Sequence, residues 1–170
     1  MKLINKIKSK RWLYISLQIL LLIAVYLSVR AYTQRDLVRD PPAFSATLLS
    51  GQMFNLPFQQ QEPLLLHFWA SWCPVCKLEQ DSIQSISQQY SVVTVAMQSG
   101  EQSELKEYMR SENLSFPVIT DNDGRIATQY GVKAVPVSFI LNPDGKIVFT
   151  ESGFTSSWGL QVRLWLANYL

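Results

Sequence analysis

The sequence has only two cysteines and one histidine in 170 residues. Two cysteines are too few for a small scaffold held together by disulfides, and a bridge across the two residues between them would constrain the unfolded chain very little. The formal net charge is only +2, and five of the basic residues lie in the first eleven positions. The rest of the chain therefore has no broad basic surface, and we expect no nucleic-acid partner.

The first part of the chain has the composition of a membrane anchor. Residues 1–11 are basic without any acidic residue, and residues 12–30 form an apolar run that ends in Arg30. A helix needs about 20 apolar residues to cross a bilayer, which is long for the apolar part of a cleaved signal. We therefore expect a cytoplasmic tail over 1–11 and a transmembrane anchor over 12–30, oriented by the positive charges. The alternative is a cleaved signal peptide that releases a soluble product.

One globular domain is expected after the anchor. Residues 31–43 are polar, carry charges of both signs and contain Pro41-Pro42, which cannot continue a helix, so they predict a linker. The remaining residues, 44–170, show no shift in composition that would divide them. With 48% hydrophobic residues, the chain is long enough to bury a single core there.

Strand and helix patterns alternate through residues 44–170. Two short strand patterns flank a Ser50-Gly51 turn and predict a hairpin. Strands and helices then alternate, followed by an antiparallel hairpin and a last helix. The expected strands are 46–49, 53–58, 64–69, 92–97, 116–120, 135–141 and 146–150, and the expected helices are 74–90, 101–112, 125–130 and 156–170. This order predicts an α/β fold with a central mixed sheet flanked by helices and preceded by a hairpin.

Two of these helices carry an apolar stripe. The stripe of the helix at 74–90 consists of Val75, Leu78, Ile83, Ile86 and Tyr90. The stripe of the helix at 156–170 consists of Trp158, Val162, Trp165, Leu166 and Tyr169, and Leu160 and Leu164 broaden it. We expect each stripe to pack inward on the sheet. The alternative for the last helix is a second contact with the membrane.

The two cysteines lie at the predicted junction of the strand 64–69 and the next helix. A thiolate is the attacking group in disulfide exchange, and the free N–H groups of a helix N-terminus favour an anion. We expect Cys73 to be the exposed nucleophile, and Cys76, one turn further on, to be the more buried resolving thiol. Pro74 suits the first helical position because no N–H is needed there. The alternatives are two ordinary core cysteines, or a Cu(I) or zinc site with His67 as third ligand, one short of a closed structural zinc site.

The run from Phe68 to Cys76, together with Val135-Pro136, resembles the thioredoxin superfamily. More narrowly, it is similar to the TlpA-like membrane-anchored disulfide oxidoreductases, in the branch of suppressor of copper sensitivity protein D and the mycobacterial DsbE-like protein. Supporting stretches are 95–100, 116–118, 130–132 and 155–160. The resemblance covers residues 44–170. It implies a thioredoxin-like fold, protein thiol and disulfide substrates, and no cofactor beyond the redox-active disulfide Cys73-Cys76.

The resemblance also assigns supporting roles near Cys73. It implies that Pro136 follows a cis peptide bond opposite Cys73, so that Val135 offers backbone groups to a substrate strand. Trp72 would shield the edge of the site, and the loops around Trp72, Val75 and Val135 would set specificity. The alternatives are a trans proline at a strand edge and a Trp72 that only packs.

His67 departs from the family pattern, in which a buried aspartate is common at this point of the strand. A histidine here would move protons near neutral pH, or as a cation favour the thiolate. The alternative is a neutral, hydrogen-bonded core histidine. Glu79, three residues after Cys76, would assist proton transfer if it behaved as acidic residues do in some relatives. A solvated charge in the second turn of a helix is the favoured interpretation, and Glu79 is left off the catalytic set.

The predicted function is a membrane-anchored thiol:disulfide oxidoreductase that faces the bacterial periplasm from the inner membrane. A reductase kept reduced by a membrane electron donor is favoured over an oxidase. The alternative from another class is a copper-binding or copper-chaperone module that uses the Cys73 and Cys76 thiolates, although related copper chaperones have a longer cysteine spacing and a distant histidine. A third alternative is a plain protein-interaction domain.

Overall fold

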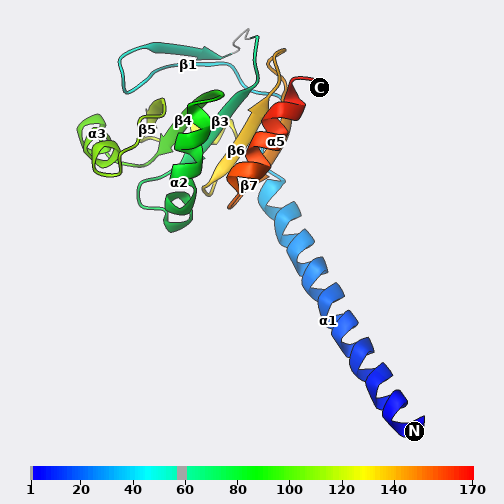
Figure 1. Ribbon diagram of the computed structural model, residues 1–170. Coiled ribbons are helices and arrows are strands. Elements are labelled where there is room, and N and C mark those ends of the chain that lie inside the picture. The colour runs from blue at the N-terminus through cyan, green and yellow to red at the C-terminus, as the bar shows by residue number, and fades with distance from the viewer. Residues whose placement is uncertain (1, 57–60) are drawn as a thin grey trace. The chain divides into compact units, whose positions relative to one another are not determined.

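The computed structural model describes residues 2–56 and 61–170, without the side chains of residues 2–11, 13 and 33. The chain divides after Arg35 into two compact units (Figure 1). The first contains helix α1 (Lys2–Gln34), whose segment Tyr14–Tyr32 has the length and apolar composition to cross a membrane. Met1 of the predicted tail and residues 57–58 of a predicted strand lie outside the described residues.

A five-stranded mixed sheet forms the centre of the second unit. In spatial order its strands are β5 (Val118–Asp121), β4 (Ser91–Met97), β3 (Leu64–Trp69), β6 (Val137–Leu141) and β7 (Ile147–Ser152). The first three are parallel, and β6 is antiparallel to both of its neighbours. Because the central strand β3 is covered on both faces, all of its residues are buried and its sequence is a continuous apolar run interrupted only by His67.

The predicted hairpin before the sheet is confirmed. β1 (Phe44–Thr47) pairs with β2 (Met53–Leu56) in a separate two-stranded sheet. An isolated bridge between Leu48 and Ile119 then joins the end of β1 to the edge strand β5. This contact covers part of a strand edge that would otherwise be free to pair with another chain.

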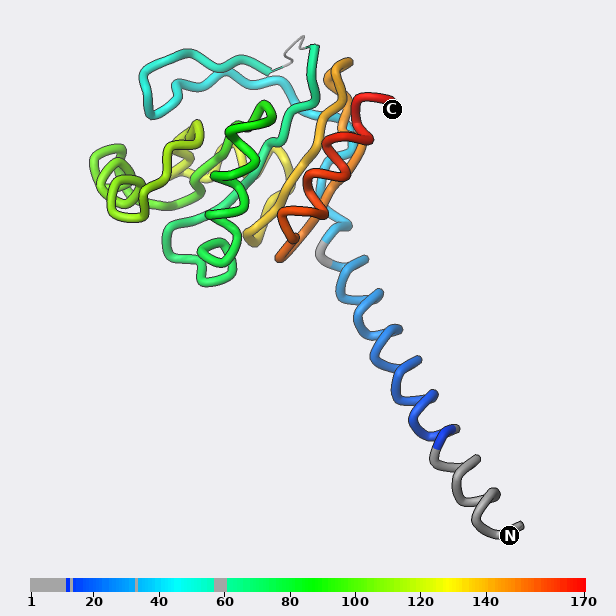
Figure 2. The backbone as a smooth tube through the Cα atoms, viewed as in Figure 1, coloured from blue at the N-terminus to red at the C-terminus, as the bar shows by residue number. Residues whose placement is uncertain are grey.

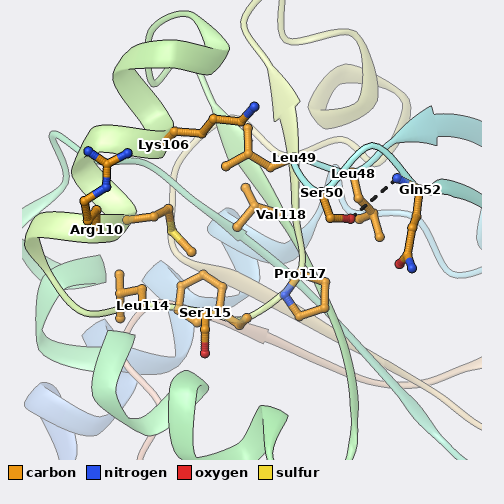
Figure 3. A pocket seen from close by; sticks show the side chains of 12 residues that line it. Leu48, Leu49, Ser50, Gln52, Lys106, Arg110, Leu114, Ser115, Pro117 and Val118 are labelled. Atoms are coloured by element: carbon orange, nitrogen blue, oxygen red, sulfur yellow. Dashed lines mark hydrogen bonds between the residues drawn. The ribbon is translucent and has the colours of Figure 1, made fainter.

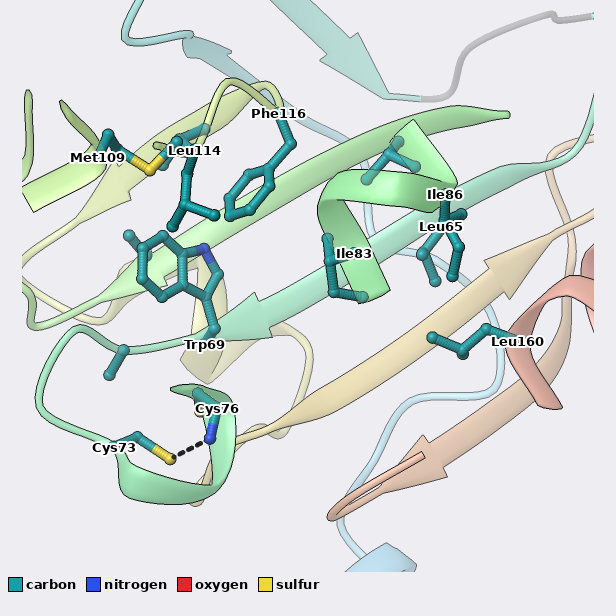
Figure 4. Packing of buried hydrophobic residues seen from close by; sticks show 14 of the residues in the cluster. Leu65, Trp69, Cys73, Cys76, Ile83, Ile86, Met109, Leu114, Phe116 and Leu160 are labelled. Atoms are coloured by element: carbon teal, nitrogen blue, oxygen red, sulfur yellow. Dashed lines mark hydrogen bonds between the residues drawn. The ribbon is translucent and has the colours of Figure 1, made fainter. Parts of the chain in front are cut away.

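Four helices complete the second unit: α2 (Pro74–Ser87), α3 (Gln102–Ser111), α4 (Arg125–Gln129) and α5 (Ser157–Ala167). Successive residues of β3 point to opposite faces of the sheet. Leu65 and Trp69 face a core cluster that includes both cysteines and residues of α2, α3 and α5 (Figure 4). Phe68 faces a second cluster with α4 and the hairpin. Figure 2 shows α2 and α5 side by side, and both helices contribute residues to the first cluster.

The two predicted apolar stripes are partly wrong. Helix α2 buries Cys76, Glu79, Ile83 and Ile86, whereas Val75 and Leu78 are exposed. Helix α5 buries Leu160, Leu164 and Ala167, whereas Trp158, Trp165 and Tyr169 are exposed. Both helices are apolar over more than one face, so hydrophobicity alone does not select the face that packs. Contacts between α2 and α5 and between α5 and β6 make that selection.

Residues 36–42 of the predicted linker lie along the second unit. The backbone nitrogen of Val38 donates to the carbonyl oxygen of Tyr130 at 3.3 Å, and the Tyr130 hydroxyl donates to the carbonyl oxygen of Pro42 at 3.2 Å. Asp36 pairs with Lys133 at 2.9 Å, and its carbonyl lies where a Cβ on Gly131 would stand. Gly131 has a φ of 69°, so glycine meets both the turn and this close approach.

Candidate active site

Cys73 occupies the N-cap of α2, between the central strand and the helix. Its backbone is extended, with φ −86° and ψ 114°, and Pro74 is the first helical residue. The backbone nitrogen of Cys76 donates to the Cys73 sulfur at 3.2 Å (Figure 4). The predicted junction is therefore present, and the sulfur accepts one of the N–H groups that have no partner within the helix. Such a donor stabilises negative charge on the sulfur.

The loop between β3 and α2 is held by hydrogen bonds to β4 and to the residues that follow β4. Trp69, the last residue of β3, donates its indole N–H to Thr94 Oγ1 at 3.0 Å. The backbone nitrogen of Ser71 donates to Ser99 Oγ at 3.0 Å. The indole of Trp72 donates to the carbonyl oxygen of Gln98 at 2.9 Å while 58% of the residue stays exposed. Trp72 therefore has a fixed position at the surface beside Cys73.

Val135 and Pro136 lie opposite Cys73, and the predicted cis bond between them is confirmed. The Cys73 thiol donates to the carbonyl oxygen of Val135 at 3.6 Å, a long contact of the kind sulfur makes. The carbonyl oxygen of Pro136 accepts from the backbone nitrogen of Gly153 at 2.9 Å. The start of α2 and the residues before β6 thus meet at the Cys73 thiol, and the turn after β7 is bonded to Pro136 behind them.

The expectation that Cys73 is exposed is wrong. Both cysteines are free thiols, and Cys73 is 4% exposed against 3% for Cys76. The Cys73 sulfur is covered because it is directed toward the Cys76 nitrogen and the Val135 carbonyl. The exposed surface next to it belongs to Trp72 and to Val75, which is 39% exposed.

Cys76 is a thiol held in its protonated form. Burial raises its pKa, and the hydrogen bond with Cys73 and the nearby carboxyl of Glu79 raise it further. A cysteine in this state is unreactive until a base takes its proton. This is the state expected of a thiol that acts second, after a mixed disulfide has formed.

Glu79 is a residue that the sequence interpretation placed wrongly. It is buried rather than solvated, and its Oε1 accepts a hydrogen bond from the backbone nitrogen of Thr155. Its Oε2 has no hydrogen-bond partner among the described residues. Burial raises the pKa of Glu79 to about 7. The available signal was its position three residues after Cys76, on the same helix face as Ile83 and Ile86.

His67 lies in β3 on the face of the sheet that carries Trp69. Its Nδ1 is 2.9 Å from Ser138 Oγ, and both side chains are buried. Burial lowers the pKa of His67 to about 4, so the ring is neutral at pH 7. The interpretation of His67 as a cation that favours the thiolate is therefore wrong at neutral pH. The alternative of a neutral, hydrogen-bonded core histidine agrees with this geometry.

The structure does not support a metal site in which His67 joins the two cysteines as third ligand. Within residues 2–56 and 61–170, no three His, Cys, Asp or Glu side chains form a group that would hold a metal ion. Cys73, Cys76 and His67 therefore do not form a shared site. Only the pair of thiols remains for a soft metal such as Cu(I).

Comparison with known proteins places the fold and the cysteine pair in a known group. Residues 39–150 match the model of the AhpC/TSA family. The chain belongs to the AhpC/TSA family. A thioredoxin-like protein of Haemophilus influenzae is 30% identical over 165 residues, which cover 95% of this chain and 98% of the relative. The sporulation thiol-disulfide oxidoreductase A of Bacillus subtilis is 32% identical over 152 residues, 85% of this chain and 91% of the relative.

A solved structure extends the likeness of this AhpC/TSA chain to three dimensions. It is that of a secreted Mycobacterium tuberculosis disulfide oxidoreductase homologous to E. coli DsbE. The two chains are 27% identical and superpose with a TM-score of 0.62, over 72% of this chain and 95% of that one. The predicted thioredoxin-like fold is confirmed, and this member of the AhpC/TSA family is a homologue of thiol-disulfide oxidoreductases.

Proposed function

We propose that the chain is a membrane-anchored thiol:disulfide oxidoreductase that acts in the bacterial periplasm through Cys73 and Cys76. The observation that carries this proposal is the Cys73 sulfur at the N-terminus of α2. It accepts the Cys76 N–H at 3.2 Å and faces the Val135 carbonyl at 3.6 Å. An extended substrate segment laid along Val135 would bring its disulfide to this sulfur.

The exchange proceeds in two balanced steps. The Cys73 thiol loses its proton to solvent, and its thiolate attacks one sulfur of a partner disulfide, which forms a mixed disulfide and releases the other partner sulfur as a thiolate. Cys76 then gives its proton to the Glu79 carboxylate and attacks the Cys73 sulfur. This forms the Cys73-Cys76 disulfide and releases the second partner thiolate. The partner has gained two electrons, and an electron donor in the membrane restores the dithiol.

The proposed location rests on the N-terminal helix. Residues 12–30 would be the anchor, with the basic residues 1–11 in the cytoplasm and the domain 44–170 on the periplasmic side. The apolar length of Tyr14–Tyr32 supports this arrangement, as does the secreted location of the M. tuberculosis relative. Likeness to that relative also supports a place in the DsbE-like branch.

A trapping experiment in cells tests the exchange. The full-length Cys76→Ala variant should accumulate a mixed disulfide with its substrate through Cys73, because the second thiol that would release the substrate is missing. The matched control is the Cys73→Ala variant, which should trap nothing. No adduct sensitive to reductant, or equal adducts in both variants, would overturn the proposed exchange.

The reduction potential of the cysteine pair tests the direction. We propose a reductase, so we expect a value closer to the roughly −270 mV of thioredoxin than to the roughly −120 mV of DsbA. Equilibration with glutathione or dithiothreitol buffers, read by thiol alkylation, gives the value. A potential near that of DsbA would make the protein an oxidase. Tight stoichiometric Cu(I) binding without any disulfide exchange would favour the copper alternative.

A further inference from the structure

A cavity of about 540 Å³ opens at the edge of the sheet (Figure 3). It lies between α3, the residues 114–118 that lead into β5, and the turn at 48–52. Its volume is in the range of roughly 300–1,000 Å³ that is usual for small-molecule sites. None of its lining residues belongs to the candidate active site, so its occupant is separate from the disulfide chemistry.

The walls of the cavity are apolar and already formed. They consist of Leu48, Leu49, Met109, Leu114, Phe116, Pro117 and Val118. The backbone nitrogen of Leu49 donates to the Val118 carbonyl at 2.7 Å, and the nitrogens of Ser115 and Phe116 both donate to Gln84 Oε1, at 2.7 and 3.2 Å. Because these backbone groups are paired, the walls offer a ligand apolar contact, and little ordering is needed on binding.

The charged groups of the cavity are all positive. Among the described residues, Lys106 and Arg110, one turn apart on α3, are the only charged ones that line it, and no carboxylate does. Arg110 pairs with Glu107 at 2.7 Å, but both side chains are mostly exposed, so this pair holds Arg110 weakly. Lys106 has no ion-pair partner in the described part of the chain. Figure 3 shows the two cations on α3 and the polar Ser50 and Gln52 across the cavity.

We propose that this cavity binds a small amphipathic carboxylate of the size of a medium-chain fatty acid. The apolar body lies against Leu49, Leu114 and Val118, and the carboxylate lies between Lys106 and Arg110. Apolar walls whose backbone nitrogens at Leu49, Ser115 and Phe116 are paired select the body. The two cations select a negative head, because Glu107, which pairs with Arg110, is mostly exposed and does not line the cavity. A neutral or positively charged amphiphile of the same length makes the apolar contacts with the walls but forms no ion pair with Lys106 or Arg110.

Photolabelling of the full chain in lipid nanodiscs tests the site. The probe is an octanoate that carries a diazirine, and mass spectrometry locates its adducts. We expect adducts in the peptides that contain residues 48–52 and 106–118, with competition from unlabelled octanoate but not from octyltrimethylammonium. The Lys106→Gln/Arg110→Gln double variant should lower this labelling by about tenfold. The matched control is Arg125→Gln, an exposed cation on α4 that does not line the cavity.

Charge reversal makes the test independent of any loss of folding. The Lys106→Glu/Arg110→Glu variant should lose labelling by the octanoate and gain labelling by an octylamine with the same diazirine. Both substitutions are at exposed positions, and circular dichroism checks that the fold is kept. The proposal is overturned if the double variants label like the wild type, if labelling is confined to α1, or if charge reversal leaves the preference unchanged.

Discussion

The carboxylate of Glu79 in α2 accepts a hydrogen bond from the backbone nitrogen of Thr155, just before α5. This contact joins the helix of the two cysteines to the turn that follows β7. It engages only Oε1, while Oε2 has no partner within the described residues. Burial raises the pKa of Glu79 from 4.5 to about 7. A carboxyl group with this pKa takes up and releases a proton near neutral pH, as a general acid or base must.

Replacement of Glu79 by glutamine should slow the second step of the exchange. The amide cannot accept the Cys76 proton, so we expect this step to slow by about 10- to 100-fold near neutral pH. In the wild type the rate should rise as Glu79 ionises through a pKa of about 7, and the variant should lack this rise. Thiol release from a preformed mixed disulfide, followed across the neutral range, measures both effects.

The matched control for Glu79 is Asp81→Asn, an exposed carboxylate two positions further along α2. It also replaces one carboxyl group of α2 by an amide but leaves the buried site intact. The control should keep the rate and pH profile of the wild type. A Glu79→Gln variant that also kept both would remove this residue from the proton transfer and leave Cys76 to lose its proton to solvent.

His67 should make the folded protein sensitive to acid. Burial lowers its pKa from 6.5 to about 4, so the unfolded chain binds the proton more readily. The contribution of His67 to stability is therefore fully present above about pH 6.5 and is lost as the pH drops through 4, by up to about 3 kcal/mol, whereas the raised pKa of Glu79 acts in the opposite direction. The His67→Ala variant should lose this dependence. Because Glu79 titrates alike in both proteins, the difference between their urea unfolding free energies isolates His67.

A second measurement separates His67 from the thiol chemistry. A neutral ring bonded to Ser138 has no charge with which to stabilise a thiolate. We therefore expect the titration curves of both thiols to be the same in His67→Ala as in the wild type. A shift of either curve would return His67 to the mechanism. If the unfolding free energies of the wild type and His67→Ala differ by the same amount at every pH, the pKa of His67 is the same in the folded and the unfolded chain.

The sequence was most informative where one local pattern decided the structure. The continuous apolar run of β3 predicted Leu64–Trp69 with the observed bounds, and Pro74 marked the start of α2. The burial of Cys73 and Glu79 was not predictable in this way. It depends on Val135 and Thr155, which are distant in the sequence and meet α2 only in the folded domain. Local periodicity contains no information about such partners.

Helix α5 provides a second case in which local periodicity did not identify the residues that pack inward. The predicted stripe contained both Leu164 and Trp165, but Leu164 is fully buried whereas Trp165 is 55% exposed. Leu164→Ala should lower the free energy of unfolding by about 2–4 kcal/mol because it leaves a cavity. Trp165→Ala should change it by less than about 1 kcal/mol, since it removes a surface ring. Urea unfolding followed by circular dichroism compares the two, and a larger loss for Trp165→Ala would mean that the aromatic part of the predicted stripe packs inward.

Trp72 should contribute to recognition of protein substrates rather than to the chemistry of the thiols. Its indole is fixed by Gln98 and exposed beside Cys73, where a polypeptide would contact it but a small disulfide would not. Trp72→Ala should therefore lower kcat/KM for a protein disulfide by about tenfold and that for glutathione disulfide by less than about twofold.

Two further variants test whether Trp72 acts by contacting the substrate or by ordering the loop of Cys73. Trp72→Phe keeps a ring but loses the hydrogen bond to Gln98, so its activity should fall between those of the wild type and the alanine variant. Trp165→Ala removes a ring of similar exposure on α5 and should leave both substrates unaffected. Equal losses with the protein and the small disulfide in Trp72→Ala would mean that the indole orders the Cys73 loop, because a disturbed thiol slows every substrate alike.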